Sequence, residues 1–272
     1  MSTQQRIIFF ISDSTGITVE KLGRSLLSQF PDIDFQRISL RYVDSVDKVA
    51  KAREEIEAAA KNSGKPPIVL STLAQPALCE ALKTDAAVVL DVFGTFLDLL
   101  EAPLQQKASH AAGHAHRVAE PRAYMARMDA VNYALRYDDG LGGADYGRAD
   151  VILLGVSRSG KTPVCLYLAM QYGLFAANYP LVDEDLQTTS LPSVLQPFRP
   201  KLFGLTIEPQ RLQKIRARRY SGRDYADLGQ CRREVARAEA LFAANQLPVL
   251  DTTVVSVEEI ATQILAQMQM NP

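Results

Sequence analysis

The sequence is poor in cysteine and has no long apolar run, and both features limit what the protein can be. Its three cysteines lie far apart, form no C-x-x-C pair, and are Cys79, Cys165 and Cys231. An odd number of scattered cysteines argues against a disulfide framework or a thiolate metal site and fits a reducing compartment. No stretch approaches the roughly eighteen uncharged apolar residues of a membrane-spanning helix. We therefore expect a soluble cytoplasmic protein with no membrane association.

A strong charge imbalance is also missing. The 30 basic and 31 acidic residues leave a formal net charge of -1, so the charge gives no reason to expect nucleic acid as a partner. The composition is 47% hydrophobic and 22% charged, as in ordinary globular proteins. A chain of 272 residues is long enough for one large or two modest domains, each with its own core.

Short apolar runs alternate with helical patterns along most of the chain. In the first hundred residues the pattern predicts strands at 6–12, 35–43, 68–71 and 86–91, with helices at 19–29, 45–62 and 76–83 between them. Between residues 101 and 120 the alternation lapses into Ala, Gln, His and Gly, which predicts a linker or an ordered loop. A helical pattern follows at 123–136. Alternation of this kind indicates parallel sheets with crossover helices.

The alternation resumes after residue 150. Strands are predicted at 151–154, 174–179, 201–207 and 248–251, and helices at 161–172, 209–220, 228–245 and 256–270. Ser256 with Glu259 forms a capping-box pattern at the start of the last helix. We predict an α/β fold with an N-terminal parallel α/β unit at 1–100. A linker and helical connection follows at 101–148, and a phosphate-loop, kinase-like α/β domain at 149–272.

A phosphate-binding motif follows the apolar run at 151–154. It has the pattern G-x-x-x-x-G-K-[ST] and consists of Gly155, Val156, Ser157, Arg158, Ser159, Gly160, Lys161 and Thr162. Its glycines let backbone N–H groups curl around phosphates, and the following helix adds the positive end of its dipole. Lys161 is expected to reach the terminal phosphates, and the Thr162 hydroxyl to ligate Mg²⁺. The alternative is an ordinary glycine-rich turn between a strand and a helix.

Proteins with this loop also place an acid near Mg²⁺, commonly at the end of a neighbouring strand. Asp183 and Asp251 are the candidates, and either could instead be a solvated loop acid. The helix at 211–219 is strongly basic. Its arginines could close over the transferring phosphoryl group as a lid, or form a solvated charged face.

Two further clusters have alternative interpretations. Residues 11–16, Ile-Ser-Asp-Ser-Thr-Gly, lie where the first strand ends, which is a ligand position in open α/β sheets. Capping of the next helix by Ser14 or Thr15 is the preferred interpretation there. His110, His114 and His116 could chelate a metal, but no third ligand of obvious type lies nearby except Glu101 or Glu120, so a loop that carries histidines is favoured.

Taken together, these segments resemble the bacterial phosphoenolpyruvate synthase regulatory proteins, relatives of the pyruvate, phosphate dikinase regulatory proteins. The resemblance covers nearly the whole chain. It is carried by residues 11–16, 102–106, 116–117, Tyr124 with Arg127, 138–140, 151–163, 166–171, 177–180, 201–207 and 256–262.

The resemblance implies a bifunctional enzyme. Such proteins transfer the β-phosphoryl group of ADP to a threonine of their target, and remove it with inorganic phosphate as acceptor, giving pyrophosphate. On this basis residues 155–162 would hold ADP and Mg²⁺, and Asp183, Asp139 or Asp13 would orient the acceptor. The target would be phosphoenolpyruvate synthase, with the dikinase as the alternative. The sequence lacks the H-R-D and D-F-G signatures of ordinary protein kinases.

Two functions of other classes remain as alternatives. One is a nucleotide-sensing module that regulates its partner by contact alone. The other is a small-metabolite kinase, against which the additional N-terminal α/β unit argues. A homodimer is kept as one option for the oligomeric state.

Overall fold

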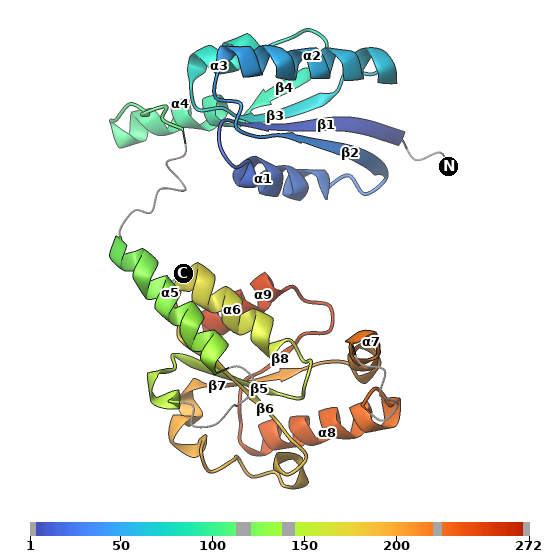
Figure 1. The fold of residues 1–272 in the computed structure, drawn as a ribbon, viewed down its shortest axis with the longest axis vertical. Helices are drawn as coiled ribbons and strands as arrows, with labels where there is room; N and C mark the ends of the chain where they lie inside the picture. The colour runs from blue at the N-terminus through green and yellow to red at the C-terminus, as the bar shows by residue number, and fades with distance from the viewer. Residues whose placement is uncertain (1–3, 113–120, 138–144, 220–224, 269–272) are drawn as a thin grey trace. The chain divides into compact units, whose positions relative to one another are not determined.

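The computed structural model describes residues 4–112, 121–137, 145–219 and 225–268. The chain divides into two compact units, Met1–Arg117 and Val118–Pro272 (Figure 1). Each unit has its own sheet and its own hydrophobic core, and each is described separately below.

The first unit contains a four-stranded sheet in the order β2-β1-β3-β4. Its strands are β1 (Gln4–Ser12), β2 (Ile33–Leu40), β3 (Ile68–Thr72) and β4 (Val88–Asp91). All three pairings are parallel, with Phe9 opposite Ile38 on one side and Val69 on the other. The connecting helices are α1 (Ile17–Leu27), α2 (Val46–Ser63) and α3 (Pro76–Leu82).

Helices cover both faces of this sheet, as Figure 1 shows. Phe9, Ile11 and Val69 pack with apolar residues of α2 and α3 on one face. Ile8 and Phe10 pack with α1 on the other. A Cβ on Gly23 of α1 would come within 2.3 Å of the Phe10 ring, so this glycine allows the helix to lie close to the sheet.

A fourth helix of this unit, α4 (Val92–Leu104), was not predicted. The expectation of an irregular segment from residue 101 onwards is wrong for residues 101–104, which form the last turn of α4. The Asp91 carboxylate begins the helix by accepting a hydrogen bond of 3.0 Å from Gly94 N–H. None of the residues of α4 is buried, although its apolar residues lie along one side of the helix and Thr95, Asp98 and Glu101 lie on the other. The one-sided pattern that reveals a surface helix is therefore present at residues 92–104, and the prediction overlooked it.

The second unit contains a four-stranded parallel sheet in the order β6-β5-β7-β8. Its strands are β5 (Val151–Gly155), β6 (Ala176–Pro180), β7 (Leu202–Thr206) and β8 (Val249–Asp251). Its helices are α5 (Pro121–Arg136), α6 (Lys161–Tyr172), α7 (Pro209–Arg219), α8 (Leu228–Ala244) and α9 (Val257–Gln267). The predicted capping box of the last helix is confirmed, because Ser256 and Glu259 exchange the expected hydrogen bonds.

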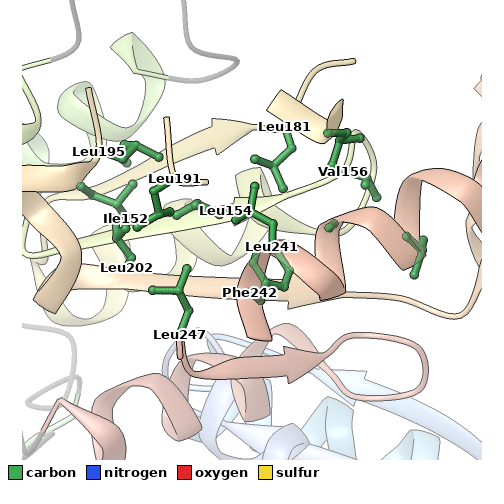
Figure 2. Packing of buried hydrophobic residues seen from close by; sticks show 14 of the residues in the cluster. Ile152, Leu154, Val156, Leu181, Leu191, Leu195, Leu202, Leu241, Phe242 and Leu247 are labelled. Carbon is green, nitrogen blue, oxygen red and sulfur yellow. The ribbon is translucent and has the colours of Figure 1, made fainter. Parts of the chain in front are cut away.

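Strand β5 is buried along its whole length because helices cover both faces of the sheet. Val151 and Leu153 pack with residues of α5, α6 and α9. Ile152 and Leu154 point to the opposite face, where Leu241 and Phe242 of α8 fill the core (Figure 2). Val156, the first residue after β5, belongs to this same cluster and is 2% exposed, so the phosphate loop begins inside the core.

The two units share one strand order, although no sequence repeat is visible. Within each unit the first strand lies between the second and the third, and all pairings are parallel. In a sheet of this kind the chain reverses its winding direction between the first and third strands, and ligands bind outside their carboxyl ends. The predicted α/β class with parallel sheets is therefore confirmed. For the second unit this rule predicts a ligand position at the ends of β5 and β7.

Candidate phosphate-binding site

The predicted phosphate motif forms a tight turn between β5 and α6. Gly155 is the last residue of β5, and Gly160 is the N-cap of α6 in the left-handed region, with φ 97°. Arg158 also has a positive φ of 74°, which is uncommon for a residue with a side chain. The turn thus leads into the N-terminus of α6, the end of a helix at which free backbone N–H groups and the dipole favour an anion.

The turn is closed so tightly that its first residue has no room for a side chain. A Cβ on Gly155 would lie 2.6 Å from the carbonyl oxygen of Leu205 in β7 and 2.6 Å from the Ser159 hydroxyl. Ser159 itself is 1% exposed. The motif's first glycine is therefore required by close packing against the neighbouring strand.

The Lys161 side chain folds back over the beginning of the loop. It is buried, and its Nζ donates hydrogen bonds to the carbonyl oxygens of Gly155 at 2.9 Å and Val156 at 3.0 Å. A buried ammonium group is stable only where it is paired or hydrogen-bonded. These two carbonyl bonds hold the ammonium group at the start of the loop.

Two side chains that sequence reasoning missed support the loop from neighbouring strands. Asn178 of β6 is 1% exposed and donates a 3.3 Å hydrogen bond to the Thr162 hydroxyl. The Thr252 hydroxyl, just after β8, lies 2.9 Å from the Ser159 carbonyl and 3.0 Å from that of Thr206. In both contacts the two residues are far apart in the sequence, and no local pattern indicates that they meet.

The basic helix α7 matches neither of the two interpretations offered for it as a whole. Arg211, Lys214 and Arg218 are exposed, whereas Arg216 is buried. Arg216 Nη2 donates to the carbonyl of Ser157 at 3.1 Å and to the Glu234 carboxylate of α8 at 2.6 Å. Burial alone would lower the pKa of the Arg216 guanidinium, but Glu234 outweighs that effect and raises it. The phosphate loop is thus bound to α7 and α8 by a buried cation.

Comparison with known proteins identifies the family of this chain. The sequence profile of the kinase/pyrophosphorylase family matches residues 8–265. This chain belongs to the kinase/pyrophosphorylase family.

Relatives in this family are similar to the chain over almost their full length. A protein of Alkalilimnicola ehrlichii is 48% identical over 270 residues, which cover 99% of this chain and 98% of the relative. A protein of Legionella pneumophila strain Paris is 45% identical over 262 residues, covering 96% and 97%. Both carry the name "Putative phosphoenolpyruvate synthase regulatory protein". The resemblance inferred from the sequence motifs is therefore confirmed.

Among the acidic candidates for a kinase/pyrophosphorylase site, Asp183 is exposed and follows β6, which pairs directly with β5. Two residues before it, Leu181 N–H donates to the Gly155 carbonyl at 3.1 Å. Asp251 ends β8, which is separated from β5 by β7, and its carboxylate accepts from Thr253 N–H. Asp139 lies outside the described residues.

Asp13 lies in the first unit and has a structural partner there. It is buried, and its Oδ2 accepts a 2.8 Å hydrogen bond from Ala74 N–H, which joins the ends of β1 and β3. The expected capping of α1 by Ser14 or Thr15 is wrong. The N-cap is Gly16, which is in the left-handed conformation and has no side chain to form a capping bond.

One of the three histidines proposed as metal ligands, His110, lies in the described part of the chain. Its Nδ1 lies 3.1 Å from the Ala74 carbonyl, to which it can donate, whereas His114 and His116 lie outside the described residues. Within the described ranges, no group of three His, Cys, Asp or Glu side chains is arranged to hold a metal ion.

The helices that the structure describes include none that is long and apolar enough to cross a membrane.

Proposed function

We propose that this protein transfers the β-phosphoryl group of ADP to a threonine of phosphoenolpyruvate synthase, and removes it by phosphorolysis with inorganic phosphate. The observation that carries the proposal is the phosphate loop at residues 155–162, with Lys161 held at its start by the Gly155 and Val156 carbonyls. Family membership and the names of the relatives support the reaction class and the target.

The residues present fit a magnesium-bound nucleotide. The loop N–H groups and the dipole of α6 would hold the phosphates, and Lys161 would neutralise the terminal one. A hydroxyl oxygen has two lone pairs, so the hydrogen bond that Thr162 accepts from Asn178 is compatible with metal ligation. Mg²⁺ usually takes one or two protein ligands together with phosphate oxygens and water. When bound, the metal would neutralise part of the charge on the phosphates.

Asp183 is our choice for the carboxylate that receives the threonine proton. It is exposed, as a group that meets a protein substrate must be, and it follows the strand next to β5. The threonine oxygen forms a bond to the β-phosphorus while the bond from that phosphorus to the bridging oxygen of AMP breaks. The hydroxyl proton passes to Asp183, and AMP leaves with the bonding electrons.

The reverse direction would use the same loop. Here an oxygen of inorganic phosphate forms a bond to the phosphorus of phosphothreonine, and the bond to the threonine oxygen breaks. Asp183 returns a proton to that oxygen, and pyrophosphate is the product. One set of cations and N–H groups can stabilise both transfers, because each passes through a phosphoryl group in line between two oxygens. If pyrophosphate formation survives in Lys161→Ala while transfer from ADP is lost, the two directions use different sites.

The proposal is tested by incubating the purified protein with ADP labelled in its β-phosphate and with each target, the synthase or the dikinase. We expect label on a threonine of the synthase, located by mass spectrometry. Label only on the dikinase would change the target. A second arm uses ATP labelled in its γ-phosphate with ADP removed enzymatically; transfer in this arm would contradict ADP as the donor.

A further inference from the structure

The buried Arg216 guanidinium holds two parts of the second unit together. Besides the Ser157 carbonyl and Glu234, it contacts Tyr225, donating to that residue's carbonyl at 3.3 Å and lying 4.5 Å from the centre of its ring. Gln230 in turn donates to Glu234 at 2.9 Å. An arginine fork with this many partners has little freedom to move, so it fixes Tyr225 relative to the phosphate loop.

Tyr225 also contacts the loop directly. Its hydroxyl lies 2.9 Å from the Ser157 hydroxyl, and the two form a hydrogen bond. Ser157 is therefore held twice, through its carbonyl by Arg216 and through its side chain by Tyr225. Both contacts are half-buried, which leaves this hydroxyl pair at the rim of the loop rather than inside the core.

The position of Lys161 shows which end of a phosphate chain this rim faces. In loops of this type the backbone cradles the phosphates nearer the nucleoside, and the lysine reaches the terminal ones. Here Lys161 Nζ lies against the carbonyls of Gly155 and Val156, immediately before Ser157 in the chain. The Ser157–Tyr225 pair thus stands beside the place where the phosphate chain would end.

We propose that Ser157 and Tyr225, positioned by Arg216, close the end of this site and select a nucleoside diphosphate over a triphosphate. The inference rests on the proposed function and names the residues that set its donor. A third phosphate would need space and further cationic partners beyond Lys161. The nearest buried cation, Arg216, is already engaged by Glu234 and by the Ser157 carbonyl. With the diphosphate bound, the β-phosphoryl is terminal and is the group available for transfer.

The test measures binding rather than turnover, with the whole chain. The magnesium complexes of ADP and of a non-hydrolysable β,γ-imido analogue of ATP are titrated by calorimetry, and their two dissociation constants are compared. We expect the wild type to favour the diphosphate by about tenfold or more, since the Ser157–Tyr225 pair closes the site beyond the second phosphate. Tyr225→Phe removes only the hydroxyl and keeps the ring over Arg216, and Ser157→Gly removes the other half of the pair.

Each variant is expected to reduce the preference for the diphosphate by about fivefold, roughly the effect of one hydrogen bond. Tyr167→Phe serves as the matched control, because Tyr167 lies on α6 in contact with Tyr172, and it should leave the preference unchanged. If Ser157→Gly fails to fold, Tyr225→Phe decides the result alone.

Three outcomes would overturn the inference: a wild type that binds both nucleotides equally, variants that keep the wild-type preference, or variants that weaken both nucleotides to the same extent. None of these outcomes contradicts the proposed function, because that function requires only that label be transferred from ADP to the target. A wild type that binds neither nucleotide and labels neither target would instead overturn the proposed function.

Discussion

Lys161 and Arg216 are the two basic side chains that are buried in the described parts of the chain, and both contact the phosphate loop. Between them they occupy three consecutive backbone carbonyls, those of Gly155, Val156 and Ser157. Burying a cation is costly unless it is well paired. Arg216 is paired with Glu234, and Lys161 donates to the carbonyls of Gly155 and Val156.

At the same scale, Asp183→Asn should slow phosphoryl transfer by about a hundredfold to ten-thousandfold, the usual contribution of a general base. The amide cannot accept the threonine proton, but it keeps the size of the side chain. Transfer is measured from labelled ADP in single-turnover conditions, and ADP affinity by calorimetry should stay within about twofold of wild type.

The control for this prediction is Glu184→Gln, which removes a charge from the next residue, also exposed. Equal losses in both variants would mean that the negative charge of the loop matters rather than Asp183 itself. Full activity in Asp183→Asn would exclude Asp183 as the general base and leave Asp139 as the candidate.

At the scale of single elements, the phosphate loop depends on close packing at its first glycine. Gly155→Ala should reduce the free energy of unfolding by about 1–3 kcal/mol, the usual cost of overpacking, because the new methyl would meet the Leu205 carbonyl at 2.6 Å. Gly147→Ala is the matched control, since there a Cβ would approach only the end of the Asp145 side chain, at 3.1 Å. Chemical denaturation of both variants measures the difference, and equal stabilities would contradict the packing argument.

Helix α9 depends on its capping box. Ser256→Ala should cost about 1 kcal/mol of stability at neutral pH, as is typical for loss of an N-cap. The backbone N–H and hydroxyl of Ser256 lower the pKa of the Glu259 carboxyl below its ordinary 4.5. A lowered folded-state pKa adds stability that is complete above the unfolded value and is lost as the pH falls through the folded value. The difference between wild type and variant, measured by denaturation, should therefore shrink below about pH 4.5, and a difference independent of pH would contradict it.

Most elements could be predicted from the sequence because their patterns are local. Strand β5 is a short apolar run followed by a glycine motif, and α9 has both a cap and an apolar stripe. Helix α4 was missed although its apolar residues lie along one side, a pattern typical of a surface helix. The inward position of Arg216 could not be predicted, since its partners lie in other elements and α7 is basic throughout.

At the scale of the whole molecule, two units with separate cores should unfold separately. Calorimetric scanning is expected to show two transitions, one for each unit. ADP at a hundredfold excess over its dissociation constant should stabilise the second unit by about 2.7 kcal/mol and raise the temperature of its transition. In Lys161→Ala that shift should disappear. A single transition for the whole chain, or an undiminished shift in the variant, would contradict this account.

Also at the scale of the whole molecule, side chains from distant parts of the chain complete the site, and the sequence could not reveal them. The motif at residues 155–162 is contiguous and could be found by inspection. Asn178, Thr252 and Tyr225 contact it from 16, 93 and 68 residues away, and only the folded sheet brings them together. Their residue types are common, so nothing in the linear sequence distinguishes them from other polar side chains.

The central claim is that the phosphate loop of the second unit is the donor site of an enzyme that modifies another protein. The most direct test compares wild type with Lys161→Ala for label transfer from β-labelled ADP to phosphoenolpyruvate synthase, with Lys61→Ala as a control in the first unit. The account predicts labelled threonine with wild type and with the control, and a loss of about a hundredfold or more with Lys161→Ala. Transfer by Lys161→Ala at nearly the wild-type rate, or a synthase that is inhibited but carries no label, would contradict it.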